Sequence, residues 1–205
     1  MPDLQRHATK AELVRIRQEL MLAQEGLSLL ERKRDSLMNQ ALEELRQARE
    51  LRQQLTERWK QLADLWKDTY KHDDVPQLRR LAQGHVFSPT VQEGGRGWMS
   101  VNLAAHTYER VTLPFLGAVM DCGLRPEQVR GMLHALMPEL IELLNRESNV
   151  RRLTRTLRQC QRQVNALEDI VIPELRQARR RIEQRLEERE RESLFQIKRL
   201  KGRLA

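Results

Sequence analysis

Histidines, cysteines and clustered carboxylates are the side chains of this chain that could bind a metal or carry out acid–base catalysis. The five histidines are scattered, and none forms the H-x-x-x-H pair of a helical metal site. Zinc needs four ligands, and beside His134 and Cys122 no further two can be named. The glutamates at 187, 188, 190 and 192 alternate with arginines, which is typical of surface ion pairs on a helix. We therefore expect no catalytic residue, no metal and no cofactor.

Three glycines near the middle of the chain raise the question of a phosphate-binding loop. Gly94, Gly95 and Gly97 are not followed by the Lys-Ser/Thr pair that such a loop carries, so this chemistry is excluded. From Trp98 onward polar and apolar residues alternate, which is typical of a half-buried strand. The segment 90–103 therefore predicts a β-hairpin with a glycine turn.

Two long stretches, residues 10–70 and 127–204, carry apolar residues at alternating steps of three and four. This repeat is typical of coiled-coil helices, each of which buries one apolar seam. Thr9, followed three residues later by Glu12, has the pattern of a helix N-cap. The seam is predicted to consist of Leu13, Ile16, Leu20, Leu27, Leu30, Leu37, Leu51, Leu55, Val150, Leu153, Leu157, Val164, Leu167 and Val171.

Helices of this length cannot surround a globular core, so we predict that they pair with each other. The predicted fold is all-α, a long antiparallel two-helix coiled coil with a small central head that contains a short β-hairpin. Residues 1–70 form the N-terminal coiled-coil helix, and residues 126–205 form the C-terminal one. Residues 71–125 form the head, with the hairpin and short helical pieces. Seven of the eight aromatic residues lie between 59 and 115, and we expect them to form a small core where the head meets the helices.

Polar residues and prolines interrupt the apolar repeat. Arg34, Glu44 and Arg58 occupy seam positions, where they either fix the register of the two helices or face a partner or solvent. Pro138 and Pro173 each remove a helix hydrogen bond, which predicts a bend or a broken turn. After Pro173 the repeat slips to two steps of four, so this position is either a compliant element or a tolerated kink.

The formal net charge of +8 resides in the second long stretch. Residues 146–205 contain 17 Lys and Arg against 9 Asp and Glu. This excess indicates either a solvated helix face or contact with an acidic partner. Arginine suits nucleic-acid phosphates, but glutamates are interleaved and no aromatic residue lies among the arginines to stack on a base. The chain has two cysteines outside any C-x-x-C pair, no apolar leader and no apolar run long enough for a bilayer, which favours a cytoplasmic protein.

Three separated blocks of the sequence closely resemble the D subunit of the vacuolar and archaeal-type (V-type/A-type) rotary ATPases and ATP synthases. The blocks are L-M-L-A-Q-E-G-L-S-L-L-E-R-K-R-D-S-L from Leu20, R-R-L-T-R-T-L-R-Q-C-Q-R-Q-V-N-A-L-E-D-I-V-I-P-E-L from Arg151, and the tail from Arg185. They cover about half of the chain, and the resemblance is not matched residue by residue in the segment 71–130. The family's marks fall on Ala23, Gly26, Leu29, Leu30, Lys33, Arg34, Asp35, Leu37, Arg151, Arg152, Leu153, Val164, Asn165, Ala166, Leu167, Glu168, Ile172, Pro173, Arg189, Glu190, Phe195, Lys198, Lys201 and Gly202.

This resemblance implies a non-catalytic rotor subunit in the central stalk of a complex for ATP synthesis or ion transport, including hydrogen-ion transport. The implied partners are the catalytic and regulatory A and B subunits of the nucleotide-hydrolysing hexamer, the F subunit, and the funnel-shaped C/d subunit above the membrane ring. The chain would be cytoplasmic and attached to the membrane only through this complex. A stand-alone basic coiled-coil scaffold or a nucleic-acid-binding protein is the alternative.

The same resemblance places both chain ends in the central bore of the hexamer. Basic and apolar residues near the C-terminus would then bear against partly acidic inner surfaces. The predicted contact residues are Phe195, Lys198, Arg199, Leu200, Lys201, Arg203 and Leu204.

Overall fold

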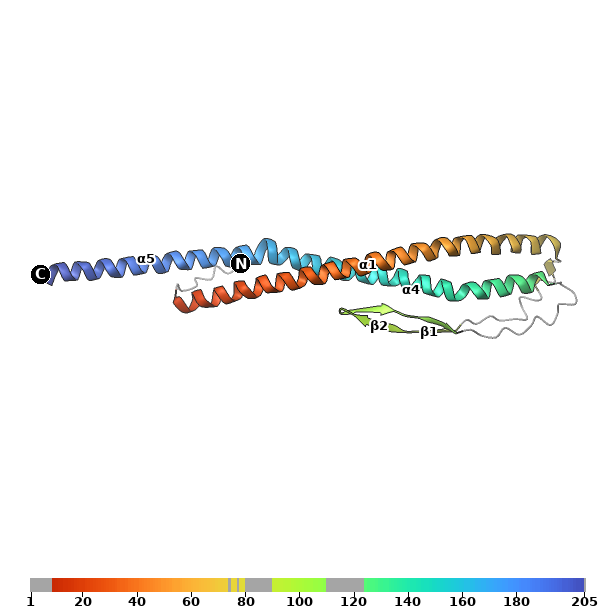
Figure 1. Cartoon of the computed structure of the whole chain (residues 1–205), viewed down its shortest axis with the longest axis horizontal. Coiled ribbons are helices and arrows are strands. Elements are labelled where there is room, and N and C mark those ends of the chain that lie inside the picture. The colour runs from red at the N-terminus through yellow and green to blue at the C-terminus, as the bar shows by residue number, and fades with distance from the viewer. Residues whose placement is uncertain (1–8, 74, 77, 80–89, 110–123, 205) are drawn as a thin grey trace. The chain divides into compact units, whose positions relative to one another are not determined.

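The computed structural model describes residues 9–73, 75–76, 78–79, 90–109 and 124–204, with residues 200–204 as backbone only. The elements are helix α1 (Lys10–His72), strands β1 (Thr90–Gln92), β2 (Gly95–Trp98), β3 (Val101–Ala104) and β4 (Thr107–Glu109), helix α4 (Arg125–Ala166), the π-helical turn η1 (Leu167–Val171) and helix α5 (Ile172–Leu204) (Figure 1). The predicted fold of paired long helices with a small β-hairpin is confirmed. The chain forms two compact units, the central unit (residues 37–156) and the terminal unit (residues 1–36 and 157–205).

Helix α1 begins at the predicted cap. The backbone N–H of Glu12 donates to Oγ1 of Thr9 at 3.2 Å, and Lys10 is the first helical residue. This bond satisfies one of the N–H groups that have no partner within the helix at its start.

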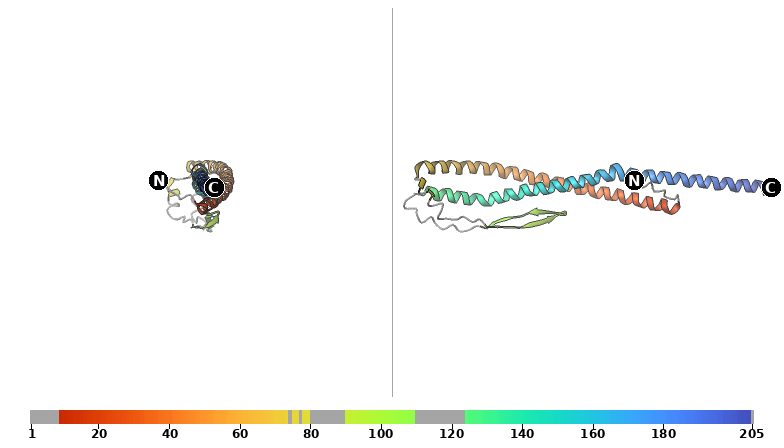
Figure 2. Two further views of the ribbon diagram at one scale, coloured as in Figure 1. Left: turned by 90° about the vertical axis from the view of Figure 1, so that its left-hand side faces the viewer. Right: turned by 180° about the vertical axis from the view of Figure 1, so that it is seen from behind.

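The core of the central unit is a seven-residue repeat on both helices. Ala48, Leu55 and Leu62 of α1 are buried against Val129, Leu136 and Leu143 of α4, with Leu51, Leu65 and Met132 packed around them. The repeat of seven keeps one face of each helix toward its neighbour over several turns. Ion pairs join Arg52 to Glu147 and Arg58 to Glu139, so α1 and α4 run antiparallel (Figure 2).

The hairpin turn begins two residues beyond the last of the predicted glycines. β2 and β3 pair antiparallel with Trp98 opposite Val101, which leaves Met99 and Ser100 as the two turn residues. Their φ angles are 42° and 69°, the left-handed values that a two-residue hairpin turn requires. The prediction of a glycine turn was therefore wrong, because Gly95 and Gly97 lie within β2. β1 and β4 extend the hairpin with Thr90 opposite Glu109.

Gly94 has a structural role at the junction between β1 and β2. Its carbonyl accepts a hydrogen bond from the Ala105 N–H at 3.0 Å. A Cβ atom at position 94 would lie 2.3 Å from the backbone oxygen of Ala105, which is closer than any ordinary contact. A side chain is therefore excluded at Gly94 by the backbone of Ala105, which lies between β3 and β4, whereas a Cβ at Gly97 would meet nothing within 4 Å.

The terminal unit pairs the start of α1 with α5. Ile16 and Ile182 are buried together, with Leu13, Ala178 and Leu186 packed against them. Nearby, Arg17 pairs with Glu183 at 2.9 Å and Lys10 with Glu190 at 3.2 Å. These contacts show that the two helices run antiparallel here, and α5 continues to Leu204, well beyond the start of α1 (Figure 1).

The two prolines of the long helices have different surroundings. α4 is continuous through Pro138, so of the two predicted outcomes, a bend or a broken turn, the broken turn does not occur there. Pro173 lies in the first turn of α5, directly after η1, where the Ile172 N–H bonds to the Leu167 carbonyl five residues earlier. The irregularity therefore precedes Pro173, whereas the sequence repeat placed the slip after it.

The predicted seam residues divide into buried and half-buried positions. At two places the fully buried residue is the neighbour of the predicted seam residue. Asn149 is buried and Val150 is half-buried, and Ile172 is buried and Val171 is half-buried. The buried seam residues are Ile16, Leu20, Leu37, Leu55, Leu153 and Val164. The half-buried ones are Leu13, Leu27, Leu30, Leu51, Val150, Leu157, Leu167 and Val171.

Candidate functional site

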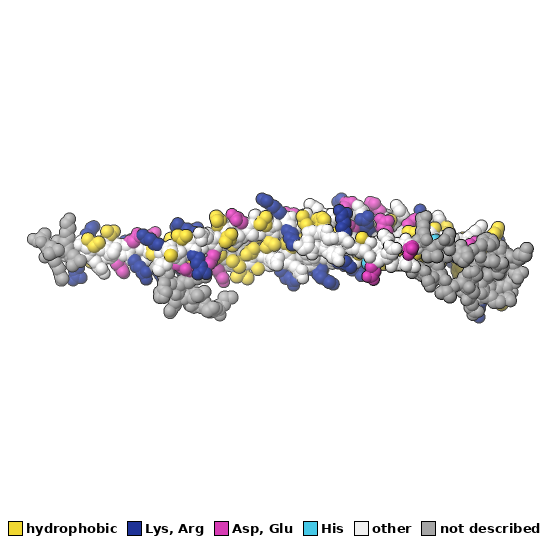
Figure 3. Space-filling model, turned by 90° about the horizontal axis from the view of Figure 1, so that it is seen from below, with side chains coloured by type: hydrophobic (Ala, Val, Ile, Leu, Met, Phe, Trp, Pro, Cys, Tyr) yellow, Lys and Arg dark blue, Asp and Glu magenta, His cyan; other side chains and the backbone are white. Residues whose placement is uncertain are grey.

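The C-terminal part of α5 presents an exposed apolar and basic surface, which we call the terminal surface (Leu194, Phe195, Ile197, Lys198 and Arg199). The three apolar side chains are 59%, 70% and 60% exposed. Lys198 and Arg199 are exposed as well, and along α5 basic, acidic and hydrophobic side chains are interspersed (Figure 3). Large apolar side chains this exposed on a helix are typical of a surface that another molecule covers.

Four further predicted contact residues lie in the last turns of the same helix. Leu200, Lys201, Arg203 and Leu204 belong to α5, but their side chains lie outside the described residues. Phe195, Lys198 and Arg199 are the predicted contact residues that the structure places on the exposed surface.

A second exposed apolar surface runs along the central unit, and we call it the apolar groove. Its aromatic members on α1 are 50% to 56% exposed, and its leucines on α4 are 37% to 52% exposed. The members are Trp59, Trp66 and Tyr70 of α1 and Leu133, Leu140 and Leu144 of α4.

The two rows of the apolar groove lie on one side of the helix pair. Each row begins four residues after a core position, as Trp59 follows Leu55 on α1. Arg52 and Glu147 have the same offset, since they follow Ala48 and Leu143 by four, and they form an ion pair. Positions at this offset therefore lie on the same side of the helix pair.

The aromatic residues do not form the small core that their clustering predicted. Trp59, Trp66 and Tyr70 are exposed, so the prediction was wrong for these three. Tyr108 instead packs edge-on against His134 with 5.6 Å between ring centroids. Phe87 and Phe115 lie outside the described residues.

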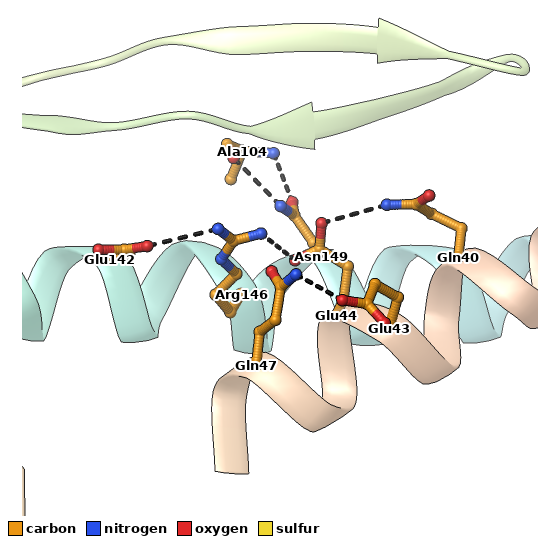
Figure 4. A network of polar contacts seen from close by, with 8 residues as sticks. All are labelled: Gln40, Glu43, Glu44, Gln47, Ala104, Glu142, Arg146 and Asn149. Atoms are coloured by element: carbon orange, nitrogen blue, oxygen red, sulfur yellow. Dashed lines mark hydrogen bonds and ion pairs between the residues drawn. The ribbon is translucent and has the colours of Figure 1, made fainter. Parts of the chain in front are cut away.

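The other side of the central core carries a buried charge. Glu44 has a side chain that is only 7% exposed, and its carboxylate accepts hydrogen bonds from Arg146 at 3.3 Å and Gln40 at 3.4 Å (Figure 4). Arg146 also reaches Glu142 at 3.3 Å. Removing one partner of a buried ion pair is costly, so this pair favours one register of α1 against α4.

The other two polar seam residues also have partners within the chain. Arg58 pairs with Glu139 across the two helices of the central unit. Arg34 bonds to its neighbour Asp35 at 2.9 Å, and this hydrogen bond raises the pKa of the Arg34 guanidinium above its ordinary value. Register between helices therefore fits Glu44 and Arg58, whereas the bond of Arg34 stays within one helix.

Two asparagines of α4 hold the hairpin by its backbone. The Asn149 amide accepts from the Ala104 N–H at 2.6 Å and donates to the Ala104 carbonyl at 3.3 Å (Figure 4). Asn145 makes the same two bonds to His106, at 3.0 and 2.7 Å. Arg152 continues the row with a 2.6 Å bond to the Asn102 carbonyl.

The spacing of these contacts follows from helix and strand geometry. Four helical residues rise by about 6 Å, and two strand residues advance by about 6.6 Å, so Asn145 and Asn149 match alternate residues of the hairpin. The strand edge that would otherwise be free is thereby occupied by amide side chains. Sequence reasoning missed this role, since Asn145 and Asn149 differ from surface asparagines only by their spacing of four.

Metal and membrane chemistry find no support in the part of the chain that the structure describes. Over residues 9–73, 90–109 and 124–199 no three His, Cys, Asp or Glu side chains are arranged to hold a metal ion. Among the described helices, none has an apolar stretch that could cross a bilayer.

A family model for the D subunit of ATP synthase matches residues 12–202, which includes both long helical regions and the hairpin. The chain belongs to the ATP synthase D-subunit family. The family match covers both the apolar groove and the terminal surface, so these surfaces are features of a D-subunit chain.

Curated D subunits match this chain over nearly its whole length. It is 32% identical over 198 residues to the D subunit of the A-type ATP synthase of Methanopyrus kandleri, which covers 94% of this chain and 84% of the relative. It is 31% identical over 208 residues to the D subunit of the V-type ATP synthase of Thermus thermophilus, covering 96% and 87%. The A-type D subunit of Methanoregula boonei is 29% identical over 198 residues and 95% of each chain.

Proposed function

We propose that this D-subunit chain is the central-stalk rotor of a V-type/A-type rotary ATPase. It would transmit torque between the nucleotide-hydrolysing hexamer and the ion-translocating membrane ring, without catalysing a reaction itself. The observation that carries the proposal is the exposed end of α5, which continues past the Lys10–Glu190 ion pair with large apolar side chains uncovered. A helix end of this kind suits insertion into a bore lined by other subunits.

The terminal surface supplies the chemistry of that insertion. Phe195 offers an exposed ring for an apolar contact, while Lys198 and Arg199 offer positive charge to acidic inner surfaces of the A and B subunits. In this proposal Leu200, Lys201, Arg203 and Leu204 extend the same contact toward the C-terminus.

The apolar groove is the proposed contact with the F subunit. Its two apolar rows run along both helices of the central unit, so they fit the apolar face of one further helix. Arg49, Arg52 and Arg151 line a surface pocket that includes the Arg52–Glu147 pair, which favours an acidic residue on a helix that docks on this side. The head would then face the funnel-shaped C/d subunit, and attachment to the membrane would come through these partners.

The proposal is tested by reversing charge on the terminal surface. We expect Lys198→Glu combined with Arg199→Glu to lower recovery of the assembled complex, or its coupled ATP hydrolysis, by about tenfold. Arg46→Glu combined with Lys71→Glu is the matched control, because both side chains are exposed on α1 of the central unit and the net charge changes equally. Wild-type assembly and coupling in the Lys198/Arg199 variant would contradict the proposed insertion.

Nucleic-acid binding remains a measurable alternative for the basic second arm. A rotor subunit is expected to co-purify with a nucleotide-hydrolysing hexamer. Its retention on DNA is expected to be no stronger than that of an unrelated protein of the same net charge. Strong, salt-dependent retention of the pure chain on DNA, without any hexamer in the same preparation, would support the alternative.

A further inference from the structure

The π-helical turn η1 separates two stretches of helix that each follow the coiled-coil repeat. Before it, apolar or half-buried positions alternate by three and four up to Leu167, and after it the same alternation starts again at Ile172. The positions before are Leu153, Leu157, Cys160, Val164 and Leu167, and those after are Ile172, Leu175, Arg179 with its neighbour Ala178, Ile182 and Leu186. The step from Leu167 to Ile172 is five, where the repeat requires four.

We propose that η1 is a one-residue phase adapter, which absorbs an extra residue and keeps the apolar stripe of α5 directed at α1. In a continuous α-helix each additional residue turns the following helix by about 100°. The wider turn, with its bond from the Ile172 N–H to the Leu167 carbonyl, removes this rotation. Burial follows the corrected phase, since Val164, Ile172 and Ile182 are 1%, 4% and 4% exposed.

The extra residue itself is displaced to the surface. Within η1 no residue is buried, and Ile170 is 51% exposed although isoleucine is a typical core residue. It lines a shallow surface hollow with Asp169, Pro173 and Arg176. A one-residue insertion would produce this pattern, because it moves one apolar side chain to the outer face while the rest of the apolar stripe still faces α1.

Proline alone does not explain the turn. Pro173 lacks an N–H group, and its ring would crowd the Asp169 carbonyl of a regular helix, so a proline favours a wider turn just before it. Pro138, however, lies inside α4 without any change of helix type. Pro173 therefore accounts for the position of the π-helical turn in the sequence. The need to keep the apolar stripe of α5 facing α1 accounts for the presence of the turn.

A matched pair of length changes at Ile170 tests the adapter in the purified full chain. Deleting Ile170 restores the step of four between Leu167 and Ile172, so we expect a continuous α-helix and a Tm within about 3 °C of wild type. Inserting one alanine after Ile170 adds a residue that nothing absorbs, which turns Ile182 and Leu186 away from α1. We expect this insertion to lower the Tm by roughly 5–10 °C.

The substitution Pro173→Ala separates phase from proline. The proposal expects the π-turn to persist in a crystal structure of this variant, because the stripe after it still requires the same phase. An uninterrupted α-helix in Pro173→Ala, or equal losses of Tm in the deletion and insertion variants, would overturn it. These measurements use the isolated chain, so they do not depend on the proposed rotor function.

Discussion

The central unit covers its paired helices on several sides, whereas the terminal unit leaves much of its second helix uncovered. In the central unit a core with a seven-residue repeat is supported by a buried ion pair and by a hairpin bound to α4. In the terminal unit the buried pair Ile16 and Ile182 is followed by a helix end whose apolar side chains are exposed. The difference predicts that stability is concentrated in the central unit, and the exposed helix end is the surface for which we propose contact with other subunits.

The largest expected difference between the units comes from removing a core leucine. Leu136→Ala in the central unit should lower the free energy of unfolding by about 3 kcal/mol, because it removes buried methyl groups and leaves a cavity. Leu194→Ala, at a position that is 59% exposed, should change it by less than about 0.5 kcal/mol. Urea denaturation followed by circular dichroism measures both, and similar losses would refute the proposed concentration of stability.

The second-largest expected difference in unfolding free energy comes from breaking one ion pair in each unit. Arg146→Ala leaves the buried Glu44 carboxylate without its positive partner and with the longer hydrogen bond from Gln40, and should cost about 2 kcal/mol of unfolding free energy. Arg17→Ala breaks an exposed pair with Glu183 and should cost less than about 1 kcal/mol. If both substitutions have the same small effect, the buried pair does not contribute to the register of the helices.

The asparagine row gives a local way to loosen the central unit. Asn149→Ala removes two hydrogen bonds to Ala104, and should cost about 1.5 kcal/mol and speed hydrogen exchange at the Ala104 amide. Asn165→Ala is the control, because Asn165 is exposed and accepts its hydrogen bond from Gln161 of the same helix. Unchanged exchange at Ala104 in the Asn149 variant would show that the Asn149 amide does not hold the hairpin.

The smallest expected effect is a gain in stability at the hairpin turn. Met99 and Ser100 hold left-handed φ angles that asparagine and glycine adopt more easily. Met99→Asn combined with Ser100→Gly should therefore raise the free energy of unfolding by about 1 kcal/mol. Exchange of Gly97 for Asn, within β2 and outside the turn, should bring no such gain, and a gain of equal size there would argue against the assigned turn.

Much of the helical architecture follows from local sequence pattern. The alternation of three and four around Leu55 specifies a helix with one apolar face, because burial of that face depends only on the helical period. Thr9 specifies where α1 begins for an equally local reason, the hydrogen bond to the Glu12 N–H. The contact at the end of α5, by contrast, was expected only from the family resemblance, and the exposure of Leu194, Phe195 and Ile197 is a finding of the structure.

The remaining features depend on contacts between segments that are distant in sequence. The hairpin turn lies at Met99 and Ser100, and not at the glycines, in a strand register that Asn145 and Asn149 of α4 match from about 40 residues away. Trp59 is exposed, and not part of a core, because α4 packs against Leu55 and leaves the next row uncovered. Local periodicity determined which elements form and which face is apolar, while only tertiary packing decided how the faces meet, since register is a property of two segments together.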